Sequence, residues 1–78
     1  MRRLTRLMAE VFRLDENEIV SNLAIHQAAT WNSLTHMELV VSIEEAFQIQ
    51  LTEDEIAAMT SVAEIEKVLK SRDVLMAD

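Results

Sequence analysis

The 78-residue sequence contains no glycine, no proline and no cysteine. The missing cysteine excludes disulfides, thiolate nucleophiles and thiolate metal ligands. The missing glycine excludes the glycine-rich loops that bind nucleotide phosphates, and it disfavours a fold built from tight β-hairpins. Long apolar runs are absent as well, so we expect no segment that spans a membrane. These absences favour a small helical protein without intrinsic thiol or nucleotide chemistry.

The charge of the chain is acidic and unevenly distributed. Aspartate and glutamate outnumber lysine and arginine by 14 to 7, which gives a net charge of −7. All seven lysines and arginines lie in residues 2–13 or 67–72, and the segment between them carries 11 carboxylates. Such a chain repels nucleic acid and attracts basic proteins, so we expect protein partners with positive surfaces. Acids that only keep the surface solvated are the alternative explanation.

The start of the chain has some features of a signal peptide. Arg2, Arg3 and Arg6 are typical of its basic end, but Glu10 and Arg13 interrupt the apolar stretch that must follow. We therefore expect a cytoplasmic protein. The length predicts one domain over residues 1–78 with a small core, and we expect it to be a monomer.

Apolar residues recur with the 3.6-residue period of an amphipathic helix in the first half of the chain. The pattern predicts helices over about residues 3–14 and 33–48, with Asn32 or Ser33 as the N-cap of the second. Residues 15–31 have no sustained period and are expected to form a long loop.

Two capping motifs predict the helices of the second half. Thr52 with Glu55, and Ser61 with Glu64, have the spacing of a capping box. We expect residues 74–78 to fray. The predicted helices span about residues 3–14, 33–48, 53–59 and 62–72. The expected fold is all-α, a four-helix bundle with a long loop after the first helix and a short third helix.

No set of side chains has the spacing of a catalytic or metal site. His26 and His36 fit no zinc pattern, and we expect both on the solvated surface. The acidic run at residues 53–55 lacks the ligand ladder and glycine of a calcium loop. Ser33 has no recognisable histidine and acid partners for hydrolytic chemistry. We expect no metal ligands and no enzymatic activity.

One stretch of the sequence resembles a known family. Residues 31–47, Trp-Asn-Ser-Leu-Thr-His-Met-Glu-Leu-Val-Val-Ser-Ile-Glu-Glu-Ala-Phe, resemble the signature of acyl carrier proteins, and the resemblance continues through residues 49–55 and 59–62. In that family a serine at the start of the second helix, usually within Asp-Ser-Leu, carries 4′-phosphopantetheine derived from coenzyme A. The resemblance implies that Ser33 is the attachment residue. The tryptophan before the motif is more typical of specialised carriers than of the housekeeping fatty-acid type.

The resemblance implies a non-catalytic shuttle that holds acyl groups as thioesters in fatty-acid, lipid or secondary-metabolite biosynthesis. Its partners would be a phosphopantetheinyl transferase and the enzymes that load and transfer the acyl group, with basic docking surfaces. Two other functions remain open. One is an aminoacyl or peptidyl carrier. The other is an unmodified protein-interaction module on the same fold, in which Ser33 serves only as a helix cap.

The second helix is the expected docking surface, since small apolar anchors beside acidic side chains suit transient binding. The expected docking residues are Asn32, Leu34, Met37, Glu38, Val41, Glu44 and Glu45. Scattered surface exposure of single apolar residues is the alternative for this strip. Asn32 replaces the usual aspartate of the family, which keeps the cap but removes a charge that the transferase normally meets.

Carriers of this family can shelter an acyl chain between their helices. The residues expected to line such a pocket are Leu39, Ile43, Phe47, Met59, Val62 and Ile65. Ordinary packing of a hydrophobic core explains the same residues.

Overall fold

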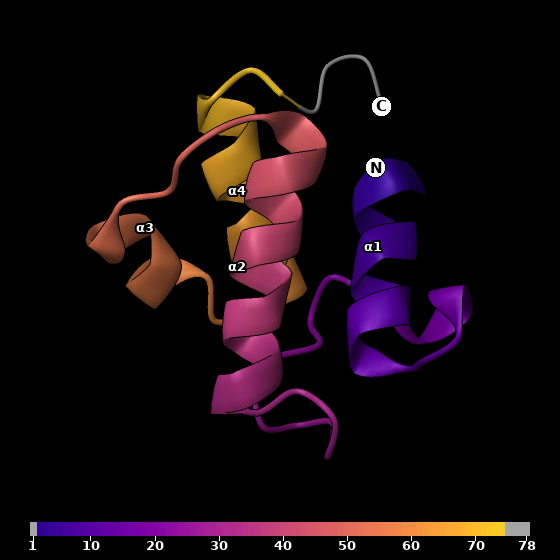
Figure 1. Ribbon diagram of the computed structural model, residues 1–78. Helices are drawn as coiled ribbons and strands as arrows, with labels where there is room; N and C mark the ends of the chain where they lie inside the picture. The colour runs from indigo at the N-terminus through magenta and orange to yellow at the C-terminus, as the bar shows by residue number, and fades with distance from the viewer. Residues whose placement is uncertain (1, 75–78) are drawn as a thin grey trace.

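The computed structural model describes residues 2–74 and confirms the predicted all-α fold class. The helical elements are α1 (Arg2–Phe12), the short 3₁₀ turn η1 (Glu16–Glu18), α2 (Ser33–Phe47), α3 (Glu53–Ala58) and α4 (Val62–Ser71). In Figure 1, α2 lies between α1 and α3, and α4 lies behind α2. None of the helices in this part of the chain is long and apolar enough to cross a membrane. Of the tail expected to fray, residues 75–78 lie outside the described residues.

A single apolar cluster joins α1, α2 and α4. Its most buried members are Leu4, Met8, Phe12, Trp31, Leu39, Ile43, Met59, Val62, Ile65 and Leu69. The long loop contributes Ile19 to the cluster, and Leu23 and Ile25 pack against it. The backbone of the loop also bonds to the start of α4, since the amide of Val62 donates to the carbonyl of Leu23 at 2.9 Å. The loop is thereby held against the bundle.

Three helices end with the same backbone motif, without the glycine that usually occupies it. Arg13, Gln48 and Asp73 follow α1, α2 and α4 with φ angles of 57°, 55° and 58°. In each case the amide of the next residue donates to the carbonyl five residues back, at 3.0, 3.2 and 3.2 Å. A chain without glycine therefore places residues with a Cβ in the left-handed region.

This motif explains why α1 is shorter than the sequence predicts. The predicted helix continued to residue 14 because Leu14 extends the apolar stripe. In the structure α1 ends at Phe12, Arg13 reverses the backbone, and Leu14 packs on the core from the turn. The other three helices end one residue before the predicted position, at Phe47, Ala58 and Ser71.

The short helix α3 has no buried residue, and polar contacts attach it to α4. Arg72 donates from Nε to Oε2 of Glu55 at 2.8 Å. Nη2 of Arg72 donates to Oε1 of Glu55 and to the carbonyl of Gln50. Glu55 also completes the predicted capping box by accepting from the amide of Thr52 at 2.9 Å. The hydrogen bond from Arg72, with the one from the Thr52 backbone, lowers the pKa of Glu55 to about 2.

We expect Gln48→Gly to stabilise the protein by roughly 0.5–1 kcal/mol, because glycine enters the left-handed region without steric cost, although it loses more entropy on folding. Urea unfolding of both proteins measures the difference. Gln48→Ala is the matched control, since it removes the same side chain but keeps the Cβ. Equal stability of the glycine and alanine variants would contradict this account of the helix end.

The lowered pKa of Glu55 predicts a pH-dependent contribution to stability. A carboxyl whose pKa falls from 4.5 to about 2 on folding stabilises the protein fully above pH 4.5. That contribution is lost as the pH falls toward 2. Glu55→Gln should therefore lower the melting temperature at pH 7 and have little effect near pH 2. Glu53→Gln, which neutralises an exposed carboxylate in the same turn, should change the melting temperature little at either pH.

Candidate functional site

Ser33 is the first residue of α2, and its side chain is exposed. Asn32 caps the helix, since its Oδ1 accepts from the amides of Leu34 at 3.0 Å and Thr35 at 3.1 Å. Thr35 returns the bond, because its Oγ1 accepts from the amide of Asn32 at 2.9 Å. The sequence left Asn32 and Ser33 as alternative caps, and the structure assigns the role to Asn32. The hydroxyl of Ser33 is therefore not used in capping.

The surroundings of Ser33 suit an attached phosphate group. Neither its amide nor its hydroxyl has a hydrogen-bond partner among residues 2–74. The amides at the start of a helix carry a positive partial charge, which favours a negative group at this end. With 15 residues, α2 is the longest helix in the described part of the chain. An exposed hydroxyl next to a free amide at this position fits a phosphate ester.

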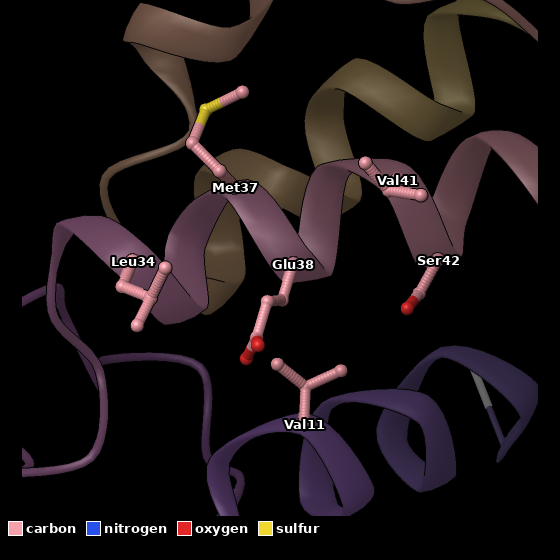
Figure 2. Close-up of a pocket in the computed structure, with 6 residues that line it drawn as sticks. All are labelled: Val11, Leu34, Met37, Glu38, Val41 and Ser42. Atoms are coloured by element: carbon pink, nitrogen blue, oxygen red, sulfur yellow. The ribbon is translucent and has the colours of Figure 1, made fainter.

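A groove of about 530 Å³ lies beside Ser33, between α2 and α1. It is lined by Val11, Leu34, Met37, Glu38, Val41 and Ser42 (Figure 2). Figure 2 shows that Val11 points from α1 toward Glu38 of α2. The structure thus brings four of the expected docking residues together and adds Val11. Sequence reasoning missed this role because Val11 follows the apolar stripe of α1 and reads as a core residue.

The groove gathers most of the exposed large apolar side chains. Within residues 2–74 these are Val20, Leu34, Met37 and Val41, and the last three line the groove. Leu34, directly after Ser33, is 71% exposed. Single exposed apolar residues are common on proteins, but three on one helix face form a patch. The arrangement is typical of a surface that binds a partner.

The expected docking acids differ in their surroundings. Glu38 and Glu45 are exposed, and neither forms an ion pair within the described residues. Glu44 is half-buried, and its Oε2 accepts from the amide of Leu51 at 2.8 Å. Glu44 therefore stabilises the segment between α2 and α3. Glu38 lines the groove, and Glu45 lies farther along α2, outside the groove lining.

The expected pocket residues lie in the core, with one at its edge. Five of them are at most 2% exposed and belong to the apolar cluster: Leu39, Ile43, Met59, Val62 and Ile65. Phe47 is half-buried, and the guanidinium of Arg3 lies 4.6 Å from the centre of its ring. This burial is also what ordinary core packing requires.

The expectation that His36 is a surface residue is wrong. Its side chain is 9% exposed, and Trp31 is fully buried. Nε1 of Trp31 donates to Nδ1 of His36 at 3.1 Å, and the indole stacks on Phe12 with ring centres 4.6 Å apart. The sequence contained a signal, because position 36 precedes Leu39 and Val40 on the inward stripe of α2. The other histidine, His26, is exposed as expected.

Metal binding finds no support within residues 2–74, where no group of three or more histidine, aspartate or glutamate side chains could hold an ion.

Comparisons with known proteins agree with this geometry. The family model described as the phosphopantetheine attachment site matches residues 2–69 of the chain. An acyl carrier protein of Buchnera aphidicola subsp. Baizongia pistaciae (strain Bp) is 28% identical over 69 residues, which cover 88% of this chain and 88% of the relative. The match to the family model includes all of α1, α2 and α3.

Proposed function

This chain belongs to the phosphopantetheine attachment family of acyl carrier proteins, and we propose that Ser33 is the residue that carries its prosthetic group. The family is non-catalytic, and its cofactor is covalently attached 4′-phosphopantetheine. The observation that carries the proposal is the exposed, unpartnered hydroxyl of Ser33 at the capped start of α2. Asn32 leaves this hydroxyl free because it satisfies the neighbouring amides.

Attachment is a phosphoryl-group transfer that a phosphopantetheinyl transferase carries out. Oγ of Ser33 forms a bond to the phosphorus that bears the pantetheine in coenzyme A. The bond from that phosphorus to the nucleotide breaks, a base of the transferase accepts the serine proton, and adenosine 3′,5′-bisphosphate departs. The part of this chain is to present the hydroxyl, and the positive end of α2 favours the phosphate that results. The thiol that the sequence lacks is supplied by the attached group.

The groove beside Ser33 is the proposed docking surface for the transferase and for the enzymes that load and remove acyl groups. Leu34, Met37 and Val41 offer the apolar contact, and Val11 completes it from α1 (Figure 2). Exposed carboxylates next to such a patch attract partners with basic surfaces and speed their encounter.

The proposed cargo is an acyl group for fatty-acid, lipid or secondary-metabolite biosynthesis, carried by a cytoplasmic monomer. The place proposed for an apolar cargo is the apolar cluster formed by Leu39, Ile43, Met59 and their neighbours. Met59, fully buried after α3, is flexible enough in shape to make room for a chain.

The attachment residue can be tested by mass. When the protein is incubated with coenzyme A and a broad-specificity phosphopantetheinyl transferase, we expect the intact mass to rise by one phosphopantetheine. Ser33→Ala should stay folded, because Asn32 makes the cap, and should gain nothing. Ser21→Ala, which removes an exposed hydroxyl of the long loop outside the groove lining, is the matched control and should be modified like the parent. Full modification of Ser33→Ala would refute the assignment, and an unmodifiable parent would favour the interaction module.

Electrostatic docking predicts a charge-dependent rate. Glu38→Lys should lower kcat/KM for modification by roughly fivefold at low salt, because like charges then meet at the interface. The difference should shrink above physiological salt, where charges more than about 8 Å apart are screened. Glu53→Lys makes the same charge change on α3, away from the groove, and should affect the rate less. If both variants react alike, the net charge of the chain and not the groove determines the rate.

A further inference from the structure

Two buried side chains form a hydrogen bond across the turn that carries Ser33. Trp31 precedes the serine by two residues, and His36 follows it by three. The indole Nε1 donates to Nδ1 of the imidazole at 3.1 Å, with the indole fully buried and the imidazole 9% exposed. From these contacts we propose that Trp31 and His36 are positioning residues for Ser33, an inference that rests on the proposed role of that serine.

The two hydrogen-bond contacts of His36 determine which tautomer its imidazole ring adopts. An indole N–H can only donate, so Nδ1 must accept and cannot carry a proton. The ring proton is then on Nε2, which lies 3.3 Å from the carbonyl of Ile56 in α3. A carbonyl can only accept, so both contacts are complete with a neutral ring of this tautomer. His36 thus joins the turn before α2 to the backbone of α3.

The hydrogen bonds between Asn32 and Thr35 and the buried bond between Trp31 and His36 hold different parts of the structure together. Asn32 and Thr35 fix the first turn of α2 to the residues just before it. Trp31 fixes that turn to the rest of the protein, because its ring stacks on Phe12 of α1. The orientation of the indole within this space is set by the acceptor that His36 provides. Ser33 therefore lies on a turn whose placement depends on the buried bond beneath it.

Loss of the bond should reduce the fraction of molecules that present Ser33 correctly. A buried donor without an acceptor drives the turn toward other arrangements, in which the indole finds water. The apparent rate falls in proportion to the competent fraction, so a fraction near a fifth gives a roughly fivefold loss. Of the groove lining, only Leu34 lies on this turn, and Val11, Met37, Glu38 and Val41 lie outside it, so the loss should appear more in kcat than in KM.

Two substitutions of His36 separate its two contacts. His36→Asn places an amide oxygen near the position of Nδ1, so it keeps an acceptor for Trp31. His36→Gln places its amide nitrogen near the position of Nε2, so it keeps only the donor toward Ile56. Trp31→Phe removes the indole donor but keeps an aromatic ring against Phe12. His26→Gln makes the same change at the exposed histidine and serves as control.

The experiment measures kcat and KM for modification by a phosphopantetheinyl transferase, at a temperature where circular dichroism shows every variant folded. We expect roughly fivefold lower kcat for His36→Gln and Trp31→Phe, and no further loss when the two are combined, since they remove one interaction. His36→Asn and His26→Gln should react like the parent. The single tryptophan gives one indole N–H resonance, whose hydrogen exchange should be slow in the parent and in His36→Asn and fast in His36→Gln.

Fast indole exchange in the folded parent would overturn the proposed bond. An unchanged kcat in His36→Gln and in Trp31→Phe would overturn the positioning role while leaving Ser33 as the attachment residue. Equal losses in His36→Asn and His36→Gln would show that the indole contact is not what matters, which also refutes the inference. If the parent itself is never modified, the proposed function fails first and the positioning role fails with it.

Discussion

A buried indole N–H must find an acceptor, and much of this structure follows from how Trp31 does so. An unsatisfied donor in the core would cost about 1–3 kcal/mol, a large share of the stability of so small a domain. Trp31 stacks on Phe12 of α1 and donates to His36 of α2, whose other nitrogen faces the carbonyl of Ile56 in α3. The stacking of the indole and its hydrogen bond to His36 together connect the long loop with three of the helices.

Some charged side chains form contacts between helices, and others face solvent without an ion-pair partner in the described residues. Arg3 lies over the ring of Phe47 and donates to the carbonyl of Ala46, which joins the start of α1 to the end of α2. Arg72 bonds to Glu55 and holds α3 against α4. These cations stabilise contacts between helices and leave the acid that lines the groove uncompensated. Basic residues at the two ends of the sequence thus make contacts between helices, whereas Glu38 and Glu45 face solvent.

The helices could be predicted from the sequence because each buries one stripe of apolar residues or begins with a capping motif. The fold class follows from that periodicity, whereas the expectation of an exposed apolar strip came from the resemblance to acyl carrier proteins. Details that depend on tertiary contacts could not be predicted. Leu14 continues a helical stripe but packs from a turn, Glu44 looks like a surface acid but bonds to the backbone, and His36 is polar but buried. In each case the deciding hydrogen bond involves a turn, a linking segment or a loop, which the helical period does not describe.

The weak attachment of α3 has a consequence for motion within the folded state. This helix has six residues, none of them buried, and is held chiefly by the bonds of Glu55 with Arg72 and of Ile56 with His36. Ile56 packs against the apolar cluster, while most of α3 faces solvent, so opening α3 exposes less apolar surface than unfolding the bundle and costs less free energy. Partial opening of this kind would uncover Met59 and the core behind it while α1, α2 and α4 stay packed. Helix α3 is thus the part of the fold that is expected to open first.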